Sequence, residues 1–67
     1  MDVTTDQAAQ LLGVTRRTIQ RYVSTGKLAF RRHGLRVVVI NLDDLRQFST
    51  ENRLIFDESL AKQLAQN

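Results

Sequence analysis

The sequence predicts a single, mainly α-helical domain that contains one small β-hairpin. Two short amphipathic segments are separated only by Gly13 and Val14, which leaves room for a tight turn between two helices. A β-branched run from Arg36 to Ile40 follows a glycine-containing turn, as in the second strand of a hairpin. A chain of 67 residues buries only about 60% of the surface that it exposes when unfolded, so all elements must share one core.

The first helix is expected to begin after Thr4. Thr4 and Gln7 have the spacing of a capping box, in which each side chain accepts a hydrogen bond from a backbone N–H at the helix start. Apolar residues follow at helical spacing, namely Ala8, Leu11 and Leu12. Gly13 can adopt the left-handed conformation that commonly ends a helix, so this first helix has about two turns.

A second helix is expected to begin immediately, with Thr15 as its N-cap. Val14 and Ile19 have the spacing of a hydrophobic staple, and Gly26 ends the helix. The residues expected to face inward are Ile19, Tyr22 and Val23, and those expected to face outward are Arg16, Arg17, Gln20, Arg21 and Ser24. Two short helices joined this tightly must cross at a steep angle, which is the helix-turn-helix geometry.

A hairpin should follow, with a first strand at residues 28–30 and a turn at residues 32–35 in which Gly34 supplies a positive φ. The second strand is expected from Arg36 to Ile40. The residues expected to point into the core are Leu28, Phe30, Val38 and Ile40. Val37 and Val39 then form an apolar outer face, which a partner or the C-terminal segment could cover.

The next helix should begin at Asn41, a good N-cap, with Asp44 favourably placed near the positive end of the helix dipole and with Leu45 and Phe48 facing inward. The polar residues 49–53 predict a break, although one long helix remains possible. Beyond it, Asp57 is a candidate N-cap for a last helix. That helix carries Leu60, Ala61 and Leu64 on one face.

The expected organisation is a winged helix-turn-helix domain at residues 1–50 and a C-terminal helical segment at residues 51–67. Residues 54–66 are nearly as apolar as the core elements, and their few charges are mixed in sign, so we expect this segment to contact a protein rather than DNA. The partner would be a second copy of the chain, a recombinase, a toxin or a polymerase. A fragment ending at Thr50 is therefore expected to stay folded.

Charge is strongly segregated along the chain. The net charge is only +3, but the window from Thr15 to Arg36 contains seven basic residues and no acidic residue, and all seven acids lie outside it. A segregated basic surface favours binding to a polyanion such as a nucleic acid.

The joint spacing of Ala9, Gly13-Val14, Ile19 and Tyr22 is the most specific signal, because it sets a close and fixed crossing of the two helices. Together with Gly26-Lys27-Leu28, the basic tip at 31–34 and the segment 43–48, it makes residues 3–48 resemble MerR-type and phage-excisionase-type winged-helix domains. The resemblance implies a recognition helix at Thr15–Thr25 in the DNA major groove. It also implies a wing at Phe30–Val38 on the DNA backbone or in the minor groove.

Full MerR activators add a long dimerisation helix and an effector domain, so the resemblance favours the small excisionase-like members and implies no small-molecule effector. The candidate DNA contacts are Thr15, Arg16, Arg17, Thr18, Gln20, Arg21, Lys27, Arg31, Arg32, His33 and Arg36. Arginine can fork onto guanine or a phosphate, and glutamine can pair with adenine. The two threonines suit phosphate contact near the helix N-terminus. Lys27 is equally well explained as compensation of the helix dipole.

Catalysis, metal binding and cofactor binding are not expected. His33 is the only histidine, there is no cysteine, and the neighbouring acids Asp43 and Asp44 cannot share one helix face as a catalytic pair. The sequence contains no apolar run near the roughly 18 residues of a membrane span. The start of the chain has no signal-peptide pattern, so a cytoplasmic protein is the expectation.

The sequence therefore predicts a sequence-specific double-stranded DNA-binding protein. The preferred role is an excisionase-like factor, which directs recombination and bends DNA in a phage or mobile element. A small transcriptional regulator or antitoxin is one alternative. The DNA-recognition subunit of a larger machine, such as a small terminase or the N-terminal domain of a recombinase, is another.

Overall fold

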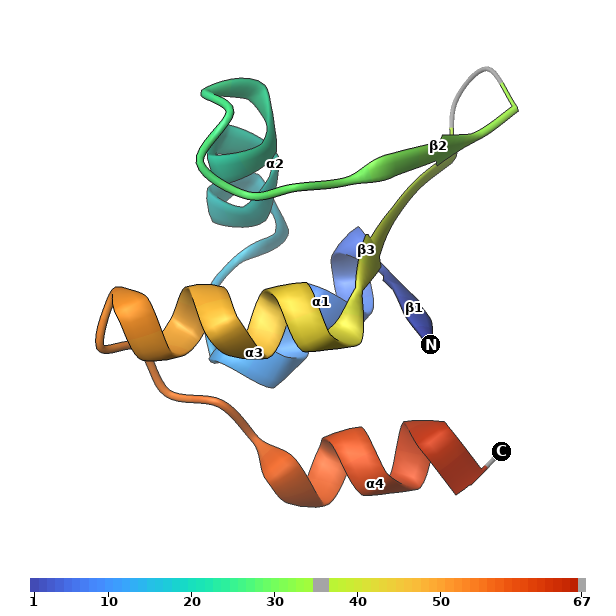
Figure 1. Ribbon diagram of the computed structural model, residues 1–67, viewed down its shortest axis with the longest axis vertical. Helices are drawn as coiled ribbons and strands as arrows, with labels where there is room; N and C mark the ends of the chain where they lie inside the picture. Colours follow the sequence, from blue (N-terminus) through green and yellow to red (C-terminus); the bar gives the residue numbers. More distant parts are fainter. Residues whose placement is uncertain (35–36, 67) are drawn as a thin grey trace.

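A computed structural model describes residues 1–34 and 37–66 (Figure 1). The elements are β1 (Asp2–Thr4), α1 (Thr5–Leu12), α2 (Arg16–Ser24), β2 (Arg31–His33), β3 (Val37–Asn41), α3 (Leu42–Glu51) and α4 (Glu58–Gln66). Helices α1 and α2 form the helix-turn-helix, and strands β2 and β3 project from it as the wing. The predicted winged helix-turn-helix fold is confirmed.

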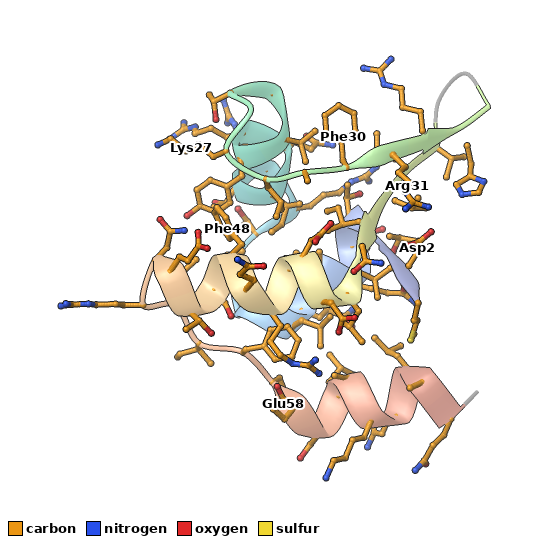
Figure 2. All side chains as sticks on the ribbon, viewed as in Figure 1. Asp2, Lys27, Phe30, Arg31, Phe48 and Glu58 are labelled. Carbon is orange, nitrogen blue, oxygen red and sulfur yellow. The ribbon has the colours of Figure 1, made fainter. Side chains whose placement is uncertain are left out.

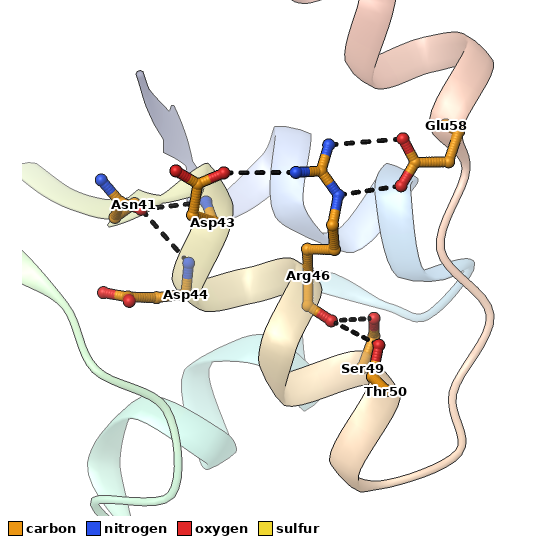
Figure 3. Close-up of polar contacts among 7 residues, drawn as sticks. All are labelled: Asn41, Asp43, Asp44, Arg46, Ser49, Thr50 and Glu58. Carbon is orange, nitrogen blue, oxygen red and sulfur yellow. Dashed lines mark hydrogen bonds and ion pairs between the residues drawn. The ribbon is translucent and has the colours of Figure 1, made fainter.

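The helix starts follow the capping residues of the sequence. At α1 the full capping box forms: the Thr4 hydroxyl accepts from the Gln7 N–H at 3.1 Å, and the Gln7 side chain accepts from the Thr4 N–H at 2.9 Å. Asn41 Oδ1 accepts from two backbone N–H groups at the start of α3 (Figure 3). Asp57 likewise accepts from the Leu60 N–H at the start of α4. These side chains satisfy donors that a helix N-terminus leaves without partners.

The predicted break after α3 exists, but it lies at the end of the expected range. Ser49 is still helical and buried, and its hydroxyl donates to the Arg46 carbonyl at 2.7 Å. The helix continues to Glu51, and the chain reverses where Arg53 adopts a positive φ of 56°. The polar side chains of this segment thus cap the end of the helix, and they do not interrupt the helix earlier.

Strand β1 was not predicted, and it makes the expected hairpin a three-stranded antiparallel sheet of order β1-β3-β2. Val3 pairs with Ile40, and both side chains are buried. The Leu42 N–H also donates to the Met1 carbonyl at 2.8 Å. The start of the chain is therefore held against the strand that leads into α3.

The expected first strand at residues 28–30 is wrong, because the strand comprises Arg31–His33. Residues 28–30 instead cross from the end of α2 to the sheet, and the Leu28 N–H still donates to the Tyr22 carbonyl of α2 at 3.2 Å. Strand alternation does not apply there: Leu28 is buried as expected, but Phe30 is 38% exposed rather than inward. Arg32 and His33, expected in the turn, lie in β2, and residues 35 and 36 lie outside the described residues.

The core lies between α1, α2, α3 and the sheet. Its buried residues include Leu11, Ile19, Leu28, Ile40, Leu45 and Phe48. In β3, Ile40 is fully buried, Val38 and Val39 are half-buried, and Val37 is exposed. The predicted inward face of this strand is thus buried most completely next to α3 and less so toward the wing tip.

Helix α4 packs against α1, on the side of the molecule away from the wing (Figure 1). Ala61 is only 3% exposed, and the Asp57 N–H donates to the Leu11 carbonyl of α1 at 2.9 Å. Further apolar residues of this segment are half-buried against the core, namely Leu54, Phe56, Leu60 and Leu64. The segment therefore covers its own domain, although not the outer face of the wing. None of the helices in the described ranges is long and apolar enough to span a membrane.

Arg46 fastens α4 to α3 (Figure 3). Its Nε and one terminal nitrogen donate to the two Glu58 carboxylate oxygens at 2.9 and 3.3 Å, and its other terminal nitrogen donates to Asp43 at 3.2 Å. The guanidinium carbon also lies 5.2 Å from the centre of the Phe56 ring. The hydrogen bond to Glu58 is the main cause that raises the pKa of Arg46 above its ordinary value, and Coulombic attraction to Glu58 adds to it. Arg46 thus stays charged and orients the start of α4.

Candidate nucleic-acid interface

The turn between α1 and α2 fixes the angle at which α2 is presented. Gly13 has a φ of 65°, a left-handed conformation that glycine adopts without steric cost. The Val14 N–H donates to the Ala9 carbonyl at 3.0 Å, which closes the turn. Ala9 is buried where the helices meet, and Ile19 of α2 is fully buried. The predicted helix-turn-helix spacing is confirmed by this geometry.

Helix α2 is also anchored from the other side, by α3. Phe48 points from α3 toward α2 (Figure 2), and its ring centre lies 5.0 Å from that of Tyr22. The planes are tilted by 58°, an arrangement that aromatic pairs favour. Tyr22 therefore packs the helix in place, as its spacing with Ile19 predicts, and it is not presented for stacking on a base.

The polar face of α2 consists of two neighbouring rows, because residues four apart lie on the same side of a helix. Arg17 and Arg21 form the outer row, and both are exposed. Arg16 and Gln20 form the second row, which borders a hollow between α2, the N-terminal part of α1 and strand β3. Each row thus combines a guanidinium at the start of the helix with a second polar group one turn later.

Thr15 and Thr18 are joined at the start of α2. The Thr15 hydroxyl oxygen accepts from the Thr18 N–H at 3.3 Å, and the two hydroxyl oxygens lie 3.0 Å apart. Thr15 is exposed and Thr18 is half-buried. Their first role is to cap the helix, so phosphate contact by either hydroxyl remains a prediction.

The wing places its three described candidate residues on two faces. In an antiparallel sheet, paired residues project to the same side. Arg31 pairs with Val39 and His33 with Val37, which puts Arg31 and His33 on one face, and Arg32 pairs with Val38 on the other. Arg32 lies with its guanidinium carbon 5.8 Å from the centre of the exposed Phe30 ring. All three polar side chains are exposed and free to approach a backbone.

Replacing Arg32 with Ala should weaken binding to all DNA sequences by a similar factor, because a wing contact to phosphate carries no base information. The slope of log K against log salt should become shallower by about 0.9, because the variant neutralises one phosphate fewer. Titration of a selected site and of a random duplex at several salt concentrations measures both effects. A decrease in affinity confined to AT-rich flanks would place Arg32 in the minor groove instead.

Lys27 is exposed just beyond α2 (Figure 2), and its N–H donates to the Tyr22 carbonyl at 3.0 Å. This position near the C-terminal end of the helix suits dipole compensation as well as DNA contact. Arg36 lies outside the described residues. Helix α2 and the wing strand β3 adjoin, because Arg16 and Gln20 line the same hollow as Val37 and Val38.

The hollow between α2 and the wing has a volume of about 310 Å³. Its polar lining comes from Thr4, Thr5, Asp6, Arg16 and Gln20, and its apolar lining comes from Val23, Val37 and Val38. Sequence reasoning found Arg16 and Gln20 but missed Asp6. Asp6 Oδ1 lies 3.4 Å from Arg16 Nε, so the contact joins α1 to α2. No local sequence pattern predicts a contact between residues on two different helices.

The fold and this surface define a winged helix-turn-helix protein of the DNA-binding class. Residues 3–53 match the family described as helix-turn-helix domain, and the chain belongs to that family. The match covers the winged part and ends before α4.

Uncharacterized proteins of Mycobacterium tuberculosis and Mycobacterium bovis are similar to this chain. Each is 40% identical to it over 62 residues, which cover 92% of this chain and 54% of the relative. The chain thus spans about half the length of the curated relatives that it matches. No solved structure matches the sequence.

Proposed function

We propose that this chain recognises a specific sequence in double-stranded DNA, with α2 in the major groove and the wing on the backbone or in the minor groove. The observation that carries the proposal is the exposed arginine and glutamine face of α2, next to a wing whose strand β2 consists of basic and imidazole side chains. A major groove admits one α-helix, and arginine and glutamine form bidentate pairs with guanine and adenine. The role is binding rather than catalysis.

The outer row of α2, Arg17 and Arg21, is the best placed to reach base edges, because nothing in the described fold covers it. The wing residues Arg31, Arg32 and His33 are assigned to the backbone, where contacts fix the register on the duplex without reading it. This assignment of base contacts to α2 and of backbone contacts to the wing agrees with other helix-turn-helix proteins, in which the second helix contacts base edges.

Binding should depend strongly on salt. If roughly four to six cations neutralise phosphates, the slope of log K against log salt should be about −4 to −5. Fluorescence anisotropy with a labelled duplex at several salt concentrations between about 50 and 200 mM measures this slope. A slope near zero would remove the assignment of the basic surface to DNA.

Among the possible processes, we propose the excisionase-like role of an architectural factor in recombination. The resemblance of residues 3–48 favours it, and α4 uses its apolar face to complete the core beside α1 of its own molecule. One molecule of such a protein would bind at each of several neighbouring sites, and together the bound molecules would bend the DNA.

Footprinting on sites selected from genomic fragments separates the candidate processes. Tandem direct repeats, with a bend detected by altered gel mobility, support the recombination role. A palindrome occupied by a stable dimer would instead favour a transcriptional regulator or antitoxin, whose protein partner would then be sought at residues 54–66.

A further inference from the structure

An acidic residue lies within the surface that we assign to DNA. Asp6, in the first turn of α1, approaches Arg16, at the start of α2, with 3.4 Å between Asp6 Oδ1 and Arg16 Nε. Both side chains are largely exposed, at 66% and 62%, and both line the hollow that also contains Gln20. A carboxylate at such a place opposes phosphate binding, so its presence calls for a physical explanation.

Helix stability alone does not explain where Arg16 lies. Arg16 and Arg17 occupy the first turn of α2, at the positive end of the helix dipole, where cations are unfavourable. The sequence of α2 contains no acid that could offset them. Asp6 supplies the missing negative charge from the neighbouring helix. The arginines in the first turn of α2 therefore lower the stability of this helix. Residues that serve binding are expected to occupy such unfavourable positions.

We propose that Asp6 determines specificity: it holds Arg16 beside Gln20 and prevents Arg16 from binding a backbone phosphate, so that Arg16 reads a base. This inference rests on the proposed DNA-binding function. The atom of Arg16 that faces Asp6 is Nε, which leaves the two terminal nitrogens for a bidentate contact with guanine O6 and N7.

Electrostatics distinguishes the two possible targets of Arg16. A phosphate bound to Arg16 would bring a full negative charge close to the Asp6 carboxylate, and like charges at short range disfavour each other. The guanine edge carries no net charge, so it can accept from Arg16 while Asp6 stays in place. Asp6 thus makes guanine the better ligand of Arg16, because it weakens the binding of a phosphate to Arg16. Specificity commonly arises in this way, by disfavouring the competing ligand.

The test compares the parent protein with Asp6→Asn, which keeps the size of the side chain and removes its charge. Selection from a random duplex library gives the base preferences of each protein, and titration of a non-specific duplex at several salt concentrations gives its affinity and salt slope. For Asp6→Asn we expect weakened guanine preference at one position. We also expect severalfold tighter non-specific binding, with a salt slope steeper by about 0.9, because Arg16 then neutralises one more phosphate.

Three further variants make the result specific to the pair. Arg16→Ala should lose preference at the same position, and Asp6→Asn combined with Arg16→Ala should behave like Arg16→Ala alone. Asp6→Glu, which keeps the charge, should retain the preference of the parent. Asp2→Asn is the matched control, because it removes one exposed acid that does not line the hollow.

Two outcomes would overturn the inference while leaving the DNA-binding function intact. In the first, Asp6→Asn binds all sequences more tightly by one factor and selects the same motif, so that Asp6 merely opposes binding. In the second, Asp6→Asn changes neither affinity nor motif, as expected for an exposed ion pair without a role. If the parent protein selects no motif and binds no duplex, the proposed function itself fails. Thermal melting of each variant confirms that it is folded.

Discussion

A fragment that ends at Thr50 should be largely unfolded at 25 °C. It lacks Ala61 in the core and the partial cover that Leu54, Phe56, Leu60 and Leu64 provide. Burying a large apolar side chain fully contributes about 1.5–3 kcal/mol, so four half-buried ones contribute about 3–6 kcal/mol, and Ala61 adds about 1 kcal/mol. Domains of this size rarely have more than about 3–5 kcal/mol of stability in total. Circular dichroism during thermal and urea unfolding measures the decrease in stability.

This expectation differs from the one that the sequence alone favoured, in which residues 1–50 fold independently. A pair of point variants tests it without shortening the chain. Ala61→Arg puts a long charged side chain into a buried position and should unfold the domain, whereas Ala65→Arg makes the same change at an exposed position of α4 and should be tolerated. If the 1–50 fragment melts like the full chain, α4 is an accessory segment and a protein contact becomes its best explanation.

Even with α4 in place, the C-terminal segment keeps one large apolar side chain in solvent. Ile55 is 77% exposed, in the linker between α3 and α4. A single exposed apolar residue is ordinary and identifies no interface. The proposed protein contact through residues 54–66 would therefore have to use the outer surface of α4 or displace that helix from α1.

Replacing Arg17 with Ala should cost about 1–3 kcal/mol of binding free energy at the preferred site and relax the preference at one base position. Arg17 is exposed on the outer row of α2, so its removal leaves the core untouched. Gln20→Ala should have a comparable effect at a different position, where adenine is preferred. Competition between the selected duplex and a random duplex gives the ratio of affinities directly.

The matched control for Arg17→Ala is Lys62→Ala, which also removes one positive charge but lies on α4, away from the wing and α2. It should leave the ratio of specific to non-specific affinity unchanged. If Arg17→Ala keeps the ratio of the parent protein, Arg17 binds only phosphate, and the base-reading face must be sought on the row of Arg16 and Gln20.

Local sequence signals predicted the helix ends, because contacts between residues close together in the sequence determine them. The capping residues Thr4, Thr15 and Asn41 begin helices as expected, and Gly13 ends α1 with a positive φ. Each depends on contacts between residues two to four positions apart, which a sequence displays directly. The pairing of Tyr22 with Phe48 was predicted only in part: each was expected to face inward, but not to contact the other.

The errors concern contacts between distant residues. The three residues of β1 are too few to show strand alternation, and they form a strand because Val3 meets Ile40 across the sheet. Phe30 was expected to be buried on the assumption that a strand begins at Leu28. The Leu28 N–H instead forms a hydrogen bond with the end of α2, and Phe30 is exposed. Asp6 was missed as part of the interface for the same reason, because its partner Arg16 lies on another helix.

The pairing of β1 with β3 has a consequence for how the chain folds during synthesis. The sheet cannot close until residues 39–41 have left the ribosome, so α1 and α2 emerge before the strand that pairs with β1 and packs against α1. Closing such a long loop costs entropy before the contacts that repay it can form. A nascent chain that ends before residue 39 would therefore remain open, and changes in Val3 or Ile40 should slow folding as well as lower stability.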